Sequence, residues 1–223
     1  MVRRITGGRA VLHEDEITYS VCASRDDFPE LGENTIQTYR KLSLALLESL
    51  RIVGVDGKWV KPSREKKSFS YNRISSKPCF VSNSRYEITV DGKKLIGSAQ
   101  RRFSYRSDHN QRDSFIQHGS ILMGKGKHSL AEFLPVRQRR ICLWQKESSS
   151  ELMKRVLEER STNMGEVLKR KIKIEEMISA LKKGFGKAFG ARMEDAVVSE
   201  EELSSARTLR EEKYLSEEWN LRR

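Results

Sequence analysis

A two-residue turn near the middle of the chain constrains the fold more than any other feature. Asp91 and Gly92 separate two β-rich stretches in the segment YEITVDGKKLIGSAQ, residues 86–100. An Asp-Gly pair favours the type I′ turn, whose backbone twist matches that of two adjacent antiparallel strands. The stretch SFIQHGSILMG, residues 114–124, has the composition of a third strand. These segments predict an antiparallel meander.

A helix is predicted over residues 34–53, before the meander. Its apolar residues recur at helical spacing, namely at Ile36, Tyr39, Leu46, Leu47, Leu50 and Val53. Asn34 and Gln37 can form a capping pair at its start, and Gly54 is well placed to end it.

The last third of the chain is helical by the same criterion. Helices are predicted at residues 151–160, 174–189 and 199–214, and the last opens with a capping box of Ser199 and Glu202. The polar stretch at residues 61–78 is expected to be an exposed loop.

These elements predict an α+β fold with a mixed, largely antiparallel sheet packed with helices. The chain has 223 residues, enough for one substantial domain. We expect a single domain over residues 1–223, with a sheet-rich core at 1–146 and a helical C-terminal part at 147–223.

Composition excludes several classes of protein. Hydrophobic residues make up 37% of the chain and charged residues 33%, which favours a folded chain over a disordered one. No apolar run reaches the roughly 18 residues of a membrane span, and no signal-peptide pattern follows the first basic residues. Cys22, Cys79 and Cys142 are too few and too scattered for a disulfide framework or a zinc site. A reduced, cytoplasmic protein is expected.

The net charge of +12 raises the question of nucleic acid. The basic residues are spread along the chain, and the spacings of RNA-binding and zinc-finger motifs are absent from the sequence. We therefore expect no nucleic-acid partner. A basic surface is equally suited to acidic protein partners.

The opening stretch RRITGGRAVLHEDEITYS, residues 3–20, combines glycines, arginines and a histidine that could bind a ligand. Gly7 and Gly8 allow a positive φ or the close approach of a ligand. Backbone N–H groups beside Arg3, Arg4 and Arg9 suit a carboxylate, a phosphate or an acyl carbonyl. An ordinary Gly-Gly turn with solvated arginines is the alternative that these residues leave open.

Cys79 is the candidate nucleophile. It follows Pro78 in a basic, loop-like stretch, where the thiolate is favoured. Cys22 and Cys142 fit the role of small buried apolar residues, and a lone cysteine more often has that role.

Lys94 is the candidate catalytic cation. It shares a strand face with Ile96 and Ser98, so its stem is expected to be partly buried, although a surface lysine is the common alternative. His13 and His118 could equally be structural histidines.

Taken together, these motifs resemble the biotin/lipoate protein ligase superfamily, and most closely its cysteine-dependent octanoyltransferases of the LipM type. The resemblance rests on RRITGGRAVLHEDEITYS, PCF, YEITVDGKKLIGSAQ, QHGSIL and EEKYLSEEWNLRR, in the family's order. ATP-dependent lipoate ligases usually have a third glycine where Arg9 stands, and an Asn-containing nucleotide-binding segment in place of EITYS. These differences favour a transferase over a ligase.

The resemblance implies a two-step acyl transfer. Octanoyl-acyl carrier protein would acylate Cys79, and a lysine of a lipoyl-domain protein, such as the glycine cleavage H protein, would then accept the octanoyl group. Lys94 would supply positive charge beside the acyl carbonyl. The acyl slot would be lined by Arg4, Thr6, Gly7, Gly8, Val11, His13, Gly97, Ser98, Ala99 and His118. No metal or cofactor is implied, since ATP and Mg belong only to the ligase alternative.

The chain also departs from the family. Members normally carry some tens of residues before the RRxTGG loop, so we expect a missing N-terminal part, encoded upstream or supplied as a separate N-terminal subunit. Residues 101–116 are longer than the usual connection before QHG. Three alternatives to the octanoyltransferase stay open: a lipoate-protein ligase, an amidotransferase acting between lipoyl domains, and a non-catalytic subunit or remnant that binds acyl groups or lipoyl domains.

Overall fold

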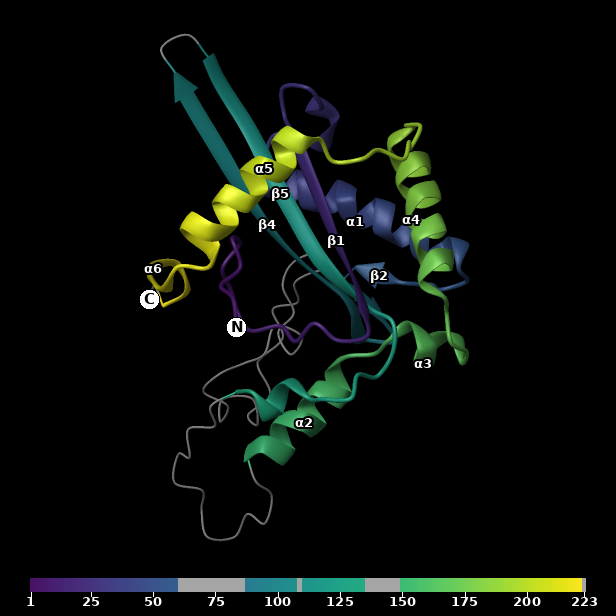
Figure 1. Ribbon diagram of the computed structural model, residues 1–223. Helices are drawn as coiled ribbons and strands as arrows, with labels where there is room; N and C mark the ends of the chain where they lie inside the picture. Colours follow the sequence, from purple (N-terminus) through teal and green to yellow (C-terminus); the bar gives the residue numbers. More distant parts are fainter. Residues whose placement is uncertain (60–86, 108–109, 135–148, 222–223) are drawn as a thin grey trace.

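The computed structural model describes residues 1–59, 87–107, 110–134 and 149–221. These residues form a five-stranded antiparallel sheet in the order β1-β5-β4-β3-β2, with helices against it (Figure 1). The strands are β1 (Glu16–Ser24), β2 (Lys58–Trp59), β3 (Ile88–Val90), β4 (Lys93–Ser107) and β5 (Asn110–Leu122). The predicted α+β class and the predicted meander are confirmed.

The Asp-Gly turn joins β3 to β4 as predicted. Asp91 has φ 49° and Gly92 has φ 77°, the two positive values that a type I′ turn requires. The turn pairs Val90 with Lys93 and so sets the register of the hairpin.

Sequence reasoning missed β1. Its alternate residues Ile17, Tyr19 and Val21 pack on or into the core, whereas Thr18 and Ser20 lie on the opposite face. This period of two is a strand signal present in the sequence, although no strand was predicted in the opening stretch.

Helices α1 (Thr35–Ile52) and α4 (Ile174–Phe189) cover one face of the sheet. The Asn34 side chain accepts a hydrogen bond from the Gln37 N–H at 3.0 Å, which confirms the predicted cap. Leu46 and Leu50 are fully buried, as the periodicity predicted. Ile36 is 46% exposed, because it lies in the first turn, beyond the part of α1 that meets the sheet.

The two helices approach closely at Gly184. A Cβ atom at this position would lie 2.7 Å from Ser49 Cα, closer than real Cβ atoms come to other atoms. Glycine at this point therefore allows α1 and α4 to pack backbone against backbone.

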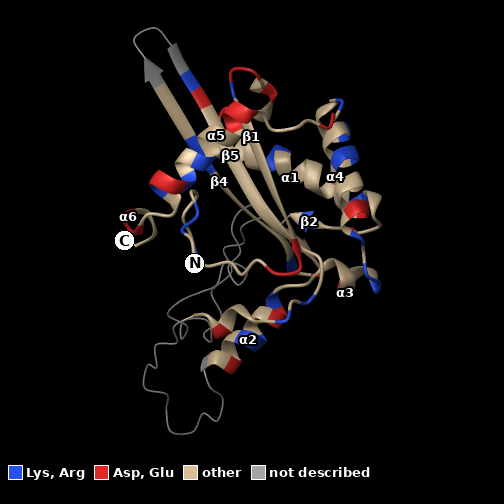
Figure 2. Cartoon of the chain, viewed as in Figure 1, with Lys and Arg blue, Asp and Glu red and all other residues tan. Residues whose placement is uncertain are grey.

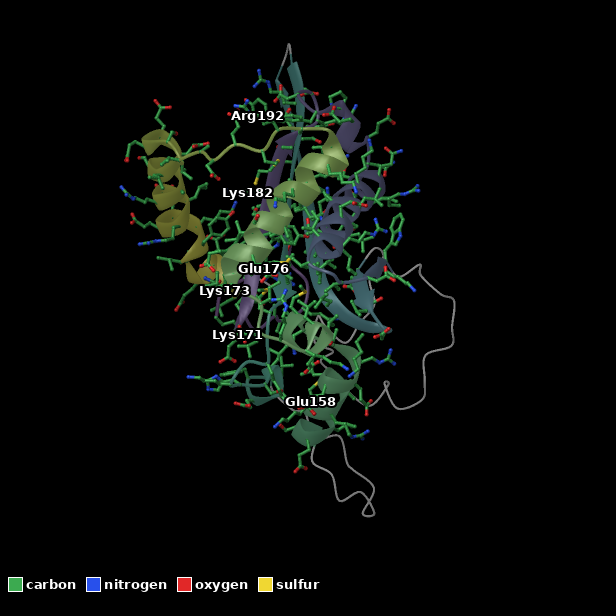
Figure 3. The ribbon with its side chains drawn as sticks, turned by 90° about the vertical axis from the view of Figure 1, so that its right-hand side faces the viewer. Glu158, Lys171, Lys173, Glu176, Lys182 and Arg192 are labelled. Carbon is green, nitrogen blue, oxygen red and sulfur yellow. The ribbon has the colours of Figure 1, made fainter. Side chains whose placement is uncertain are left out.

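The remaining helices are α2 (Ser149–Arg160), α3 (Met164–Leu168), α5 (Glu200–Leu209) and α6 (Glu217–Asn220). Ser199 and Glu202 form the predicted capping box. The predicted helix at residues 199–214 is interrupted, because Arg210–Tyr214 forms a π-helical turn. None of the α5 side chains is buried, and Figure 3 shows this helix standing away from the sheet.

Residues 101–116 are strand rather than connection. β4 continues to Ser107 and β5 begins at Asn110, so only residues 108–109 separate them. Figure 1 shows the resulting hairpin projecting well beyond the other strands.

Some predictions fall outside the described residues, among them Cys79, Cys142 and the polar stretch 61–78. Cys22 is exposed on β1, so the prediction that it is a buried apolar residue was wrong. Within the described ranges, no helix is long and apolar enough to cross a membrane.

Candidate functional site

The predicted site lies on the face of the sheet that α1 and α4 leave uncovered, here called the open face. Tyr19 of β1 packs on the helix side, so its neighbours Thr18 and Ser20 lie on the open face. The antiparallel register places His118 of β5 opposite Ser20 and opposite Ala99 of β4, on that same face.

The opening loop has a tight, glycine-dependent turn. Gly7 has φ 62° and Gly8 has φ 88°, values that L side chains rarely adopt. The Gly7 N–H donates to the Arg4 carbonyl at 2.9 Å, and the Arg4 guanidinium donates to the Arg9 carbonyl at 2.7 Å. Arg4 therefore holds the loop closed upon itself.

Two contacts attach this loop to the open face. Thr6 Oγ1 lies 2.7 Å from His118 Nε2, and the Arg101 guanidinium donates to the Ile5 carbonyl at 2.8 Å. These contacts join the loop to β5 and β4.

A third attachment comes from the other end of the chain. The Trp219 indole N–H donates to the Arg3 carbonyl at 2.9 Å, and the Arg3 N–H donates to Asn220 Oδ1 at 2.8 Å. Trp219 packs edge-on against Tyr214, with the Lys213 ammonium 5.0 Å from its ring centroid. The C-terminal EEWN segment thus holds the start of the opening loop.

A small hollow lies where the loop meets β1, β4 and β5. It is lined by Arg4, Val11, His13, Thr18, Gly97, Ser98, His118, Gly119 and Ser120. Its volume is about 20 Å³, enough for one water-sized polar group. The hollow suits a carbonyl oxygen and is too small for an eight-carbon chain.

A buried carboxylate orients the imidazole of His13. Glu16 Oε1 lies 2.6 Å from His13 Nδ1 and accepts hydrogen bonds from Thr18 and Ser120, each at 2.8 Å. Because an ionised carboxylate can only accept, Nδ1 of His13 carries the proton. In the neutral form of a ring held this way, Nε2 is the nitrogen that can accept a proton.

His118 is half-buried beneath the loop. Burial, then the nearby charges of Arg4 and His13, lowers the pKa of His118 below its usual value. The ring is therefore neutral at physiological pH and can accept the Thr6 hydroxyl proton at Nε2.

The floor of the hollow depends on residues that sequence reasoning missed. Tyr19 Oη lies 2.6 Å from Ser98 Oγ, and the Tyr39 hydroxyl donates to the Ser98 carbonyl. Burial raises the pKa of Tyr19, so its hydroxyl keeps its proton. A Cβ atom at Gly119 would lie 2.9 Å from Tyr19 Oη and would also meet the Gly97 carbonyl oxygen, so the glycine of the QHGS segment is required for this packing.

Lys94 is fully buried near the start of β4. Its Nζ donates to Glu87 Oε1 at 2.5 Å, and both side chains are 2–3% exposed. The Lys94 carbonyl accepts from the Thr162 N–H at 3.0 Å, which joins β4 to the segment between α2 and α3. The predicted burial of its stem is confirmed, although Lys94 is not among the described residues that line the hollow.

A larger hollow adjoins the small one. It has a volume of about 500 Å³ and is lined by Leu12 and Glu14, by the loop after β5 and by α2. Val11 and His13 line the small hollow, so the segment 11–14 separates the two spaces. Four lysines, four glutamates and four leucines are among the residues that line the larger hollow, so both charged and apolar side chains face it.

The structure brings together most of the predicted slot residues. Arg4, Val11, His13, Gly97, Ser98 and His118 line the small hollow, Thr6 contacts His118, and Ala99 pairs with it. Gly7 and Gly8 shape the loop and are not part of the lining.

Comparison with known proteins places this site in a family context. A family model described as the lipoyl protein ligase A/B catalytic domain matches residues 1–186. The chain is 35% identical over 222 residues to the octanoyltransferase LipM of Brevibacillus brevis, and 34% identical to that of Bacillus subtilis. Both alignments cover 100% of this chain and 74% of the relative.

Solved structures share the fold. A bi-partite lipoate protein ligase from Thermoplasma acidophilum superposes with a TM-score of 0.68 at 23% identity, over 99% of this chain and 69% of that one. A lipoate-protein ligase A bound with ATP has a TM-score of 0.65 at 24% identity, over 99% and 71% of the two chains.

Proposed function

The chain belongs to the lipoyl protein ligase A/B catalytic-domain family, and we propose that it transfers an octanoyl group to a lysine through a cysteine thioester. The relatives from Brevibacillus brevis and Bacillus subtilis, matched along the whole chain at 34–35% identity, are octanoyltransferases, so it is an acyltransferase of protein lipoylation. The observation that carries the proposal is the convergence of the opening loop, β4 and β5 on one small polar hollow.

The donor in this proposal is octanoyl-acyl carrier protein. The Cys79 thiolate attacks the thioester carbonyl, the carrier thiolate leaves and takes up a proton, and the octanoyl group becomes a thioester of Cys79. A thiolate is both a good nucleophile and a good leaving group, so this step and the next have lower barriers than a direct transfer.

The acceptor is a lysine of a lipoyl-domain protein, such as the glycine cleavage H protein. Its amine attacks the Cys79 thioester, an amide bond forms, and the Cys79 thiolate leaves. His13, oriented by Glu16, takes the proton that the amine gives up. The partners are cytoplasmic proteins, so we assign the reaction to the cytoplasm.

In this proposal, Lys94 is the cation that assists the transfer. Lys94, balanced by Glu87, provides a buried ammonium at the base of β4. The small hollow holds the carbonyl oxygen, and the octyl chain lies along the open face.

Mass spectrometry of the acyl-enzyme tests the nucleophile. Octanoyl-acyl carrier protein should add one octanoyl group that neutral hydroxylamine removes. Cys79→Ala should abolish the adduct, while the matched controls Cys22→Ser and Cys142→Ser retain it. An adduct on Cys79→Ala would exclude this mechanism.

Pyrophosphate exchange separates the transferase from the ligase alternative. With ATP and octanoate or lipoate we expect no exchange, because Arg9 and the EITYS segment replace features that ligases use for nucleotide. Acyl-dependent exchange would assign the chain to the ligases instead.

A further inference from the structure

The end of the β4–β5 hairpin extends past every other described strand. The last pair between β1 and β5 is Ser24 with Ser114, whereas β4 and β5 continue through four more pairs, from Ser104–Asp113 to Ser107–Asn110. On the other side, β3 pairs with β4 only up to Ile96. We call Arg101–Ser107 with residues 110–116 the arm. Figure 1 shows its end beyond α5.

Phe115, at the base of the arm, is buried against Leu31 and Leu42, but none of the described residues of the arm beyond β1, from residue 104 to residue 113, belongs to the hydrophobic core. A two-stranded ribbon without a third strand or a helix against it is only marginally stable in water. The part of the arm beyond β1 is therefore not required by the fold, and we look for its use in binding.

One face of the arm is aromatic and basic. Arg101, Phe103 and Tyr105 alternate along β4, and the contact of Arg101 with Ile5 places all three on the open face. Tyr105 is 70% exposed and Phe103 is 37% exposed, with the Arg101 guanidinium 5.4 Å from the Phe103 ring centroid. Opposite Tyr105 on β5 stands the exposed Arg112.

Among the arm residues whose side chains the structure describes, none on this face carries a carboxylate. The β5 residues on it, Arg112, Ser114 and Ile116, include no acid, and Asp113 turns to the other side, where it pairs with Arg25 at 3.3 Å. Arginines beside exposed aromatic rings are typical of protein interfaces, and their charge selects an acidic partner.

Distance decides which partner of the proposed reaction fits. His118 lines the small hollow, and Arg112 is six residues away along the same strand, or about 20 Å. A lysine side chain spans only about 6 Å, so an acceptor domain must dock beside the hollow. The phosphopantetheine prosthetic group of an acyl carrier protein holds its acyl group about 18 Å from the carrier surface. This length matches the distance from the hollow to the end of the arm.

We propose that the arm docks the acidic acyl carrier protein through Tyr105, Arg112 and their neighbours on the open face. This inference rests on the proposed function, since the carrier is its donor. The carrier binds at the end of the arm, and its prosthetic group follows β4 and β5 back to the hollow.

Steady-state kinetics with two donors test the proposal. Tyr105→Ala/Arg112→Glu should raise KM for octanoyl-acyl carrier protein at least about tenfold. The same variant should leave kcat, and KM for octanoyl-pantetheine, within about twofold, because the small donor needs no docking surface. Lys171→Glu is the charge-matched control, because Lys171 lies well away from the end of the arm (Figure 3).

Direct titration of the carrier protein against wild type and variant measures docking without turnover, with circular dichroism to verify folding. We expect the variant to lose about tenfold in affinity and Lys171→Glu to lose none.

Unchanged carrier affinity, or an equal rise in KM for both donors, would overturn the proposal. So would a rise in KM for the acceptor alone, which would assign the arm to the lipoyl domain. Absence of transfer from both donors, with carrier binding retained, would count against the proposed function and leave the docking surface standing.

Discussion

At the scale of single residues, the buried pair of Lys94 and Glu87 combines stability with chemistry. Both side chains are almost inaccessible to water, and the ammonium and carboxylate are 2.5 Å apart. Removing one member of such a pair costs about 3–5 kcal/mol, because the other charge is left buried without its counter-charge.

Lys94→Met should therefore destabilise the protein by several kcal/mol, and Lys94→Met/Glu87→Gln should recover much of that loss in chemical denaturation. Acylation by octanoyl-acyl carrier protein should be slower by at least about tenfold in both variants, because both lack the ammonium. Restored activity in the double variant would show that Lys94 serves stability alone.

His118 makes stability depend on pH. Burial, Arg4 and His13 lower its pKa in the folded state, so the unfolded chain binds the proton more readily. The stabilising contribution is present above the unfolded value of about 6.5 and is lost as the pH falls below it.

Urea denaturation of wild type at pH 7.5, 6.5 and 5.5 should show this loss of unfolding free energy. In His118→Gln the decline over the same range should be smaller, because Gln does not titrate. Parallel declines in the two proteins would show that His118 does not carry the pH dependence.

At the scale of elements, the C-terminal segment and the opening loop stabilise each other. Trp219 and Asn220 hold Arg3 through hydrogen bonds between residues more than two hundred positions apart. The loop has few other attachments, so its local stability depends on these bonds.

Trp219→Phe keeps an aromatic ring against Tyr214 and removes only the indole donor. The loss of one hydrogen bond, about 1 kcal/mol, should raise the open population of the loop about fivefold. Trypsin should then cleave at Arg3, Arg4 and Arg9 about five times faster, since proteolysis follows the open population. Trp59→Phe is the control, and equal cleavage rates in wild type and Trp219→Phe would contradict the contact.

At the scale of the whole molecule, the net positive charge of the protein affects how fast it meets a charged partner. The chain carries a net charge of +12, and Figure 2 shows lysine and arginine on most elements rather than on one patch. Such a field accelerates the encounter with an acidic protein and is screened by salt.

The value of kcat/KM for octanoyl-acyl carrier protein should therefore fall about tenfold between 0.05 and 0.5 M NaCl. For the neutral donor octanoyl-pantetheine it should change less than twofold. Equal salt dependence for the two donors would indicate an effect of salt on the enzyme itself.

Helices and turns could be predicted from the sequence where their signals lie within a few residues of one another. Residues 174–189 form the helix predicted there, because periodicity and caps act within a few residues. The Asp-Gly turn set the hairpin for the same reason. β1 has an alternation in the sequence that was overlooked. Residues 101–116 were misjudged because Phe115 is the only buried residue among those described there, so the segment shows no repeated apolar pattern.

The contacts within the candidate site could not be predicted from neighbouring residues in the sequence. The resemblance to the biotin/lipoate protein ligase superfamily predicted several residues of the opening loop and the QHGS segment that meet at the hollow, whereas the residues by themselves left an ordinary turn and structural histidines open. Only the tertiary structure decided that Glu16 orients His13, that Glu87 neutralises Lys94, that Trp219 holds Arg3, and that Arg101 faces the loop while Asp113 does not. Strand register and the meeting of the two chain ends determine these contacts, and both depend on burial across the whole fold rather than on neighbours in sequence.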